Sequence, residues 1–156
     1  MKIGIISDTH SILPDSIFDI FKDVKQIFHA GDIGAQEVIQ GLEIICPVYA
    51  VYGNIDTWPV TIYHPHILIH QIQDKNICVY HDIVKPKYFS YQLFKKGIIA
   101  DIVISGHTHV ASYEIFRNVL YINPGSASKS RDRKRGTVMV LDLNREPLKP
   151  EIIEII

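Results

Sequence analysis

The stretch "SGHTH" (105–109) places two histidines two positions apart, directly after the apolar run "ADIVI". Four other apolar runs are also followed by polar side chains that can bind metal or move protons. The full set is Asp8, His10, Asp32, Asn54, His81, His107 and His109. In parallel α/β proteins, ligands bind beyond the carboxyl ends of the strands. We therefore expect these donors to converge at one sheet edge.

The donor types restrict the chemistry. The set contains oxygen and nitrogen donors and no thiolate, which excludes a closed thiolate zinc site. It contains more ligands than one catalytic ion needs, because such an ion usually takes about three protein ligands. It suits two divalent ions such as Mn²⁺, Fe²⁺, Zn²⁺ or Co²⁺, with one carboxylate bridging them. Two ions about 3.5–4 Å apart can hold a phosphoryl group for in-line displacement.

Elements that could position these donors alternate in the first third of the chain. Ile-rich or apolar runs at 2–7, 24–30 and 46–52 are typical of buried strands. Apolar residues recur at helical spacing within 14–24 and 35–45. This β-α-β-α-β order predicts a parallel sheet with right-handed crossovers.

The second half is mostly β. A hairpin is predicted at 66–82 around the turn "QDKN", and another at 112–123 around Arg117 and Asn118. A helix is expected at 85–97 and a buried strand at 100–105, and 136–144 should pair with 151–156. Two sheets with flanking helices follow, within a single domain spanning 1–156.

Composition excludes several classes of protein. The 156 residues are 47% hydrophobic and 21% charged, with a net charge of −1, so the chain can fill a core. This balance gives no field for broad nucleic-acid or anionic-membrane binding. Cys46 and Cys78 lie in apolar runs and are expected to be reduced, which favours a cytoplasmic protein. The opening run "MKIGIISD" is too short for a signal peptide, and no membrane span is expected.

The ordered motifs "SDTH", "HAGD", "YGN", a lone histidine and "SGHTH" resemble those of the calcineurin-like metallophosphoesterases. The short length and the later "INPGS" resemble the small prokaryotic phosphodiesterase branch (YfcE-type). The resemblance covers Asp8 to Ser126. It implies an α/β fold, a four-layer α/β/β/α sandwich of two mixed sheets flanked by helices.

The resemblance also implies a role for each donor. Asp8, His10, Asp32 and His109 would bind a first ion, with Asp32 bridging. Asn54, His81 and His107 would complete a second. If "HTH" is extended, its histidines face the same way and can each reach one ion.

The implied cofactors are two divalent ions, with Mn²⁺ expected and Zn²⁺, Fe²⁺, Co²⁺ or Ni²⁺ as alternatives. The implied reaction is hydrolysis of a phosphate ester by a hydroxide that bridges the metals. Asp32, Asn54 and His81 would serve catalysis as well as metal binding, and Asn54 would help to hold the phosphoryl oxygens.

The chain departs from the family pattern in three places. Many members read "GNHD", whose histidine can protonate the leaving group, whereas this chain has Ile55 and retains Asp56. Losing such an acid typically costs about 10²–10⁴-fold in rate, least for good leaving groups. Asp82 replaces a frequent glycine and is either a partner for a ligand histidine or a strand-end charge. A further aspartate often found after "GD" is absent from "GDIG".

Other polar residues have less specific interpretations. His29 either bonds within the site or lies satisfied beside the core. His64, His66 and His70 are expected at surface or hairpin positions. Asn123–Ser126 is predicted to form a structural turn beside the site, with contact to substrate as the alternative. The basic run 129–136 is predicted to form an exposed loop, with contact to a substrate phosphate or nucleotide as the alternative.

Two functions stay open at this point. The first is a metal-dependent phosphodiesterase acting on a small phosphate ester. The alternative is a weakly catalytic or non-catalytic metal-binding scaffold, because the retromer's metallophosphoesterase-like subunit resembles this fold and also lacks the acid histidine. The aliphatic segment 151–156 either pairs with another subunit, which would give a homo-oligomer, or packs as an ordinary part of the sheet. The natural substrate and a preference for diesters or monoesters are not readable from the motifs.

Overall fold

Two five-stranded mixed sheets form the centre of the structure, a computed structural model that describes residues 1–128 and 135–156. The first sheet has the order β10-β9-β1-β2-β3 and the second β4-β5-β6-β8-β7. The strands of the first sheet are β1 (Lys2–Ile6), β2 (Gln26–His29), β3 (Val48–Ala50), β9 (Thr137–Asp142) and β10 (Glu151–Glu154). Those of the second are β4 (Ile67–Ile72), β5 (Lys75–Tyr80), β6 (Ile102–Ile104), β7 (Ala111–Phe116) and β8 (Val119–Pro124).

Each sheet has a parallel centre and antiparallel additions. Strands β1, β2 and β3 pair in parallel, and so do β5, β6 and β8. The additions are the predicted β4–β5 and β7–β8 hairpins and the predicted pairing of β9 with β10. The parallel strands matter for function, because candidate donors follow the carboxyl ends of all of them except β8.

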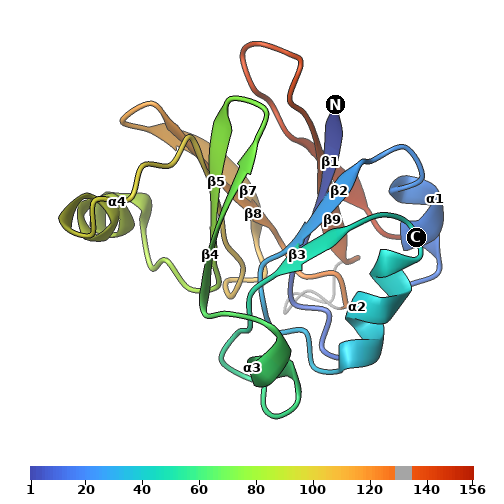
Figure 1. Ribbon diagram of the computed structural model, residues 1–156. Coiled ribbons are helices and arrows are strands. Elements are labelled where there is room, and N and C mark those ends of the chain that lie inside the picture. The colour runs from blue at the N-terminus through green and yellow to red at the C-terminus, as the bar shows by residue number, and fades with distance from the viewer. Residues whose placement is uncertain (129–134) are drawn as a thin grey trace.

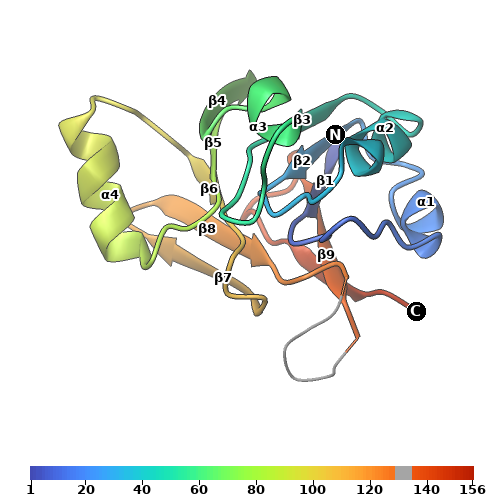
Figure 2. The ribbon, with the colours of Figure 1, turned by 90° about the horizontal axis from the view of Figure 1, so that it is seen from below.

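Helices cover the two outer faces (Figures 1 and 2). Helices α1 (Ser16–Ile20) and α2 (Gln36–Glu43) lie over the first sheet, and α4 (Pro86–Lys95) lies on the opposite side of the molecule over the second. A short α3 (Val60–Tyr63), which no sequence pattern predicted, precedes β4.

Among the described residues, three apolar clusters lie between the layers. The largest lies between the sheets and includes Ile5, Phe28, Val79, Ile104 and Ile122, all buried. A second packs the side chains of α1 and α2 against the first sheet, and a third packs α4 against the second. Burial on both faces explains why the central strands are apolar runs without alternation. The expected four-layer α/β/β/α arrangement is confirmed.

Helix α1 is shorter than the predicted 14–24. Its apolar stripe is still buried at Ile17, Phe21 and Val24, but helical backbone ends at Ile20. The Lys25 N–H already donates to the Lys2 carbonyl (2.9 Å), so the chain must turn into the parallel pairing with β1. The third strand is also less buried than predicted, because β3 lies at a sheet edge.

Cys46 and Cys78 are free thiols, and burial raises the pKa of Cys78 to about 12. Among the described residues, no helix has the length and apolar character needed to cross a bilayer. The predicted basic loop lies almost wholly outside the described residues.

Candidate metal centre

The structure brings all seven predicted donors together. They follow β1, β2 and β3 of the first sheet and β5 and β6 of the second. The expectation of a single sheet edge was therefore wrong. The carboxyl edges of two sheets, packed face to face, supply the donors jointly.

One group of donors has the compactness that a single ion requires. Asp8, His10, Asp32 and His109 each offer one ligand atom, and these four atoms lie within 4.8 Å of one another. His109 Nε2 is 3.1 Å from Asp8 Oδ1 and 3.4 Å from His10 Nε2. If each ligand atom lay about 2.0–2.2 Å from a shared ion, the ligand atoms would be separated from one another by distances similar to these two.

Asp8 shows that this group fits a cation. Its side chain is fully buried, and Oδ2 accepts hydrogen bonds from Ser7 Oγ (2.7 Å) and the His107 N–H (3.2 Å). Oδ1 accepts no hydrogen bond from any described residue, although His109 Nε2 is close. Burial raises the pKa of Asp8. A cation at Oδ1 would offset that burial.

The remaining donors form a second group beside the first. Asn54 Oδ1 lies 3.0 Å from His81 Nε2 and 2.9 Å from His107 Nδ1. His81 Nε2 is also 3.3 Å from Asp32 Oδ1. Asp32 therefore contacts both groups.

The protonation of His81 also points to a cation. Its Nδ1 donates to the Ala30 carbonyl (2.7 Å), so in the neutral ring Nε2 carries a lone pair. That lone pair faces Asn54 Oδ1 and Asp32 Oδ1, which are both acceptors. Burial lowers the pKa of His81, but the Asp32 carboxylate and the Ala30 carbonyl outweigh it and the net pKa is raised. Either a proton or a metal ion must occupy this position.

Asp32 itself stays ionised. Burial favours its neutral form, but hydrogen bonds with His81 and with the Ile55 N–H (3.1 Å) prevail, and its pKa lies below the usual value. A carboxylate charged at neutral pH, in contact with both groups, can bind two cations at once.

The loops bearing the donors have unusual backbone conformations. Five of the seven donors adopt positive φ: Asp8 (54°), His10 (47°), Asp32 (54°), His107 (70°) and His109 (62°). The expected extended conformation of "HTH" was therefore wrong. His107 and His109 still diverge to different groups, but through two left-handed residues rather than through strand alternation.

Two glycines let these loops approach each other closely. A Cβ on Gly53 would lie 2.9 Å from Asp32 Cγ and collide with Asp32 Oδ1. A Cβ on Gly106 would lie 2.7 Å from Asp8 Oδ2 and collide with Ser7 Oγ. The glycines that precede donors in the sequence thus leave room for carboxylates from other loops.

Asp56 ties two of the loops together. Its carboxylate, only 8% exposed, accepts hydrogen bonds from the N–H groups of Ile33 (3.1 Å), Gly34 (2.7 Å) and Gly53 (2.8 Å). These groups flank Asp32 and Asn54. Asp56 therefore fixes the loop geometry around both donors.

His29 links the loop after β1 to the loop after β2. The buried ring accepts the Gly31 N–H at Nδ1 (3.2 Å), which leaves Nε2–H to donate to Thr9 Oγ1 (3.0 Å). Thr9 Oγ1 donates in turn to the Ile33 carbonyl (3.0 Å). Burial lowers the pKa of His29 to about 3, so the ring is neutral.

The "NPGS" turn after β8 supports the loops that carry Asp8 and His107. Asn123 Nδ2 donates to the Gly106 carbonyl (2.7 Å) and Thr108 Oγ1 (3.0 Å), and Ser126 Oγ donates to the Asp8 carbonyl (3.0 Å). This agrees with its predicted structural role.

Ile55 and Asp82, two of the positions where the chain departs from the family motifs, both lie beside candidate metal ligands. Ile55 is 44% exposed beside Asp32 and carries no group that could transfer a proton. Asp82 Oδ2 lies 3.7 Å from His107 Nε2, on the ring edge away from Asn54. Of the two interpretations of Asp82, the geometry supports a partner for a donor histidine.

The remaining histidines make other contacts. His64 and His70 bond to glutamine side chains, at 2.9 Å from Gln36 Oε1 and 3.2 Å from Gln26 Oε1, and His66 stacks on Tyr52. None of the three belongs to the four-residue group described above.

Comparison with known proteins identifies the family. The model of the calcineurin-like phosphoesterase superfamily domain matches residues 1–146. A probable metallophosphoesterase of Methanothermobacter thermautotrophicus is 37% identical over 160 residues, covering 98% of this chain and 92% of the relative.

Solved structures share the fold over nearly the whole chain. One is described as a novel archaeal phosphodiesterase, with 27% identity, a TM-score of 0.78, and coverage of 98% of this chain and 100% of the other. Another is Vps29 of Entamoeba histolytica in complex with Zn²⁺, with 20% identity, a TM-score of 0.78 and 99% coverage of both chains. The protein belongs to the calcineurin-like phosphoesterase superfamily and is a metal-dependent phosphoesterase.

Proposed function

We propose that this protein hydrolyses phosphodiesters at a site that binds two divalent cations. The observation that carries the proposal is the position of Asp32, whose carboxylate contacts both groups of donors. In this proposal Asp8, His10, Asp32 and His109 bind one ion. Asp32, Asn54, His81 and His107 bind the other.

The cations, when bound, supply an activated water and neutralise charge on the phosphoryl oxygens. The chain's own residues hold the geometry. The Ala30 carbonyl keeps the proton of His81 on Nδ1 and directs Nε2 into the site. Asn54 lies between His81 and His107, where its amide can also orient a phosphoryl oxygen.

The leaving group receives no proton from residue 55. The exposed Ile55 side chain has no group that could transfer a proton, so a departing alkoxide must leave without an acid from this position. Phenolate-type leaving groups, which depart readily as anions, should therefore react best. A diester preference is supported by the similarity to the archaeal phosphodiesterase.

Manganese is the proposed physiological ion. The donors are carboxylate, amide and imidazole groups, which suit Mn²⁺, and also Zn²⁺, Fe²⁺, Co²⁺ and Ni²⁺. Neither cysteine is among the donors. Free thiols at Cys46 and Cys78 support the cytoplasm as the proposed compartment. The single domain spanning 1–156 and self-association through 151–156 stay predictions.

The scaffold alternative gains no specific support. The likeness to Vps29, at 20% identity, shows a shared fold alone. A scaffold would have no need of Asp56, His29 and Asn123 as converging supports for the donor loops.

The proposal is tested with bis(p-nitrophenyl) phosphate and added Mn²⁺. Wild-type protein should hydrolyse it, and Asp32→Asn should lose roughly 10³-fold or more in kcat/KM, because one bridging charge is removed. Asp23→Asn, on an exposed residue, is the matched control and should retain wild-type activity. A wild-type protein that binds Mn²⁺ and is no faster than Asp32→Asn would overturn the proposal in favour of the scaffold.

A further inference from the structure

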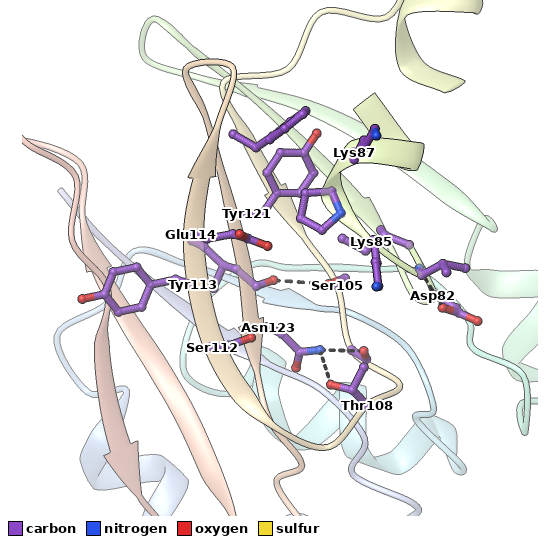
Figure 3. Close-up of a pocket in the computed structure, with 16 residues that line it drawn as sticks. Asp82, Lys85, Lys87, Ser105, Thr108, Ser112, Tyr113, Glu114, Tyr121 and Asn123 are labelled. Carbon is purple, nitrogen blue, oxygen red and sulfur yellow. Dashed lines mark hydrogen bonds between the residues drawn. The ribbon is translucent and has the colours of Figure 1, made fainter. Parts of the chain in front are cut away.

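A cavity of about 620 Å³ lies next to the metal centre, on the face of the second sheet that α4 covers (Figure 3). Its walls are the segment 82–87, which leads into α4, and the β7–β8 hairpin. Small-molecule sites typically occupy about 300–1,000 Å³. The cavity is thus large for a methyl ester and suits a substituent the size of a nucleoside.

One end of the cavity is built from the same loop as the metal centre. Gly106 and Thr108 line it, and Asn123 holds both in place by hydrogen bonds to the Gly106 carbonyl and Thr108 Oγ1 (Figure 3). Asp82 lines the other wall and lies 3.7 Å from His107 Nε2. A phosphoryl group held beside His107 could therefore place one ester substituent in the cavity.

The lining combines an aromatic floor with cations. Phe116, a partly exposed residue of β7, and Tyr121 of β8, which is only 3% exposed, line the cavity. Lys85 and Lys87 come from the opposite wall, and neither forms an ion pair with any described residue. Aromatic rings bind planar groups, and unpaired ammonium groups bind anions.

Two acidic groups, Asp82 and Glu114, share the lining with the lysines. Asp82 Oδ1 accepts the Val84 N–H (3.0 Å), and its Oδ2 faces His107. Glu114 lies on the hairpin wall opposite the lysines, where it can accept hydrogen bonds from hydroxyl or amino groups (Figure 3).

The segment that carries the lysines is strained. Val84 has φ of 58°, which is rare for a β-branched residue. The Val84 N–H bond to Asp82 and the Lys85 N–H bond to the Ile83 carbonyl (2.6 Å) hold this conformation. Strain of this kind persists where surrounding structure enforces it, often at ligand sites.

We propose that this cavity binds one ester substituent of the substrate, an aromatic or heteroaromatic group that bears a second anionic group facing Lys85 and Lys87. The inference rests on the proposed phosphodiesterase function and adds the substrate class. The preferred substrate is then a nucleotide-like diester with an additional phosphate or carboxylate.

Three substrates with the same p-nitrophenolate leaving group test the proposal: methyl p-nitrophenyl phosphate, thymidine 5′-(p-nitrophenyl phosphate) and its 3′-phosphorylated form. Wild-type kcat/KM should rise along this series. Lys85→Glu/Lys87→Glu should lose roughly tenfold or more on the 3′-phosphorylated diester, because charged hydrogen bonds are lost, and change less than about twofold on the methyl diester. Lys95→Glu/Lys96→Glu, on exposed residues at the far end of α4, is the control of equal charge and should behave as wild type.

Binding gives a readout independent of turnover. Calorimetric titration of Mn²⁺-loaded protein with thymidine 3′,5′-bisphosphate should show affinity that falls roughly tenfold in Lys85→Glu/Lys87→Glu and not in the control. Equal rates on the three substrates, or equal effects of the two double variants, would overturn the cavity inference alone. Hydrolysis of none of the three substrates would overturn the proposed function itself.

Discussion

Most of the candidate metal ligands in this protein have backbone conformations that non-glycine residues rarely adopt. Asp, Asn and His adopt positive φ more readily than other non-glycine residues, and such a conformation still costs about 1–3 kcal/mol per residue. Five of the seven candidate metal ligands have positive φ. Hydrogen bonds that involve Asp56, His29 and Asn123 support the loops that hold these conformations.

At the residue scale, restoring an acid at position 55 should change the substrate range. Ile55→His places an imidazole at the exposed rim beside Asp32, so it should leave the fold intact. We expect activity on diesters with alkyl leaving groups to rise by about 10²-fold, and activity on p-nitrophenyl diesters to rise much less. Steady-state kinetics on both substrate types measure this, with Ile55→Gln as a polar control that cannot transfer a proton. An equal gain on both types, or none, would contradict the role assigned to Ile55.

At the element scale, parallel strands from two sheets bring together residues that are a hundred positions apart. Apolar runs and the polar residues after them were enough to predict the central strands and the donors. They could not predict which loops touch. The close approach of Gly106 to Asp8 and the left-handed turns at His107 and His109 arise only when the sheets pack. The helix end at Ile20 and the edge position of β3 likewise depend on strand pairing.

The packing of the β6 loop against the β1 loop gives a direct prediction. Gly106→Ala should displace Asp8, because the added Cβ would lie 2.7 Å from Asp8 Oδ2, and Mn²⁺ affinity should fall by at least about tenfold. Gly97→Ala is the control, since no atom lies within 4 Å of the added Cβ. It should destabilise the fold by about 1 kcal/mol through its positive φ and leave Mn²⁺ affinity unchanged. Equal Mn²⁺ affinity in the two variants, measured by calorimetry, would contradict this packing.

At the scale of the whole molecule, buried polar supports make stability depend on pH. The folded protein keeps His29 neutral down to about pH 3, whereas in the unfolded chain the ring titrates near 6.5. Below pH 6.5 the unfolded state therefore binds more protons, and stability falls as the pH falls.

This linkage predicts a loss of about 2 kcal/mol in the free energy of unfolding between pH 7.5 and pH 5 from His29 alone. His29→Gln, which removes the titrating ring, should lower stability at pH 7.5 but reduce the pH dependence by about that amount. Urea unfolding with a chelator present, at both pH values, measures the difference. Parallel pH profiles for the two proteins would show that His29 is not the linked group.

The central claim is that Asp32 joins two cation sites within one pocket. Anomalous scattering from a crystal of the Mn²⁺-loaded protein tests it most directly. We predict two peaks, one among Asp8, His10, Asp32 and His109 and the other among Asp32, Asn54, His81 and His107, separated by about 3.5–4 Å. A single peak at saturating Mn²⁺, or two peaks that do not share Asp32, would contradict the claim.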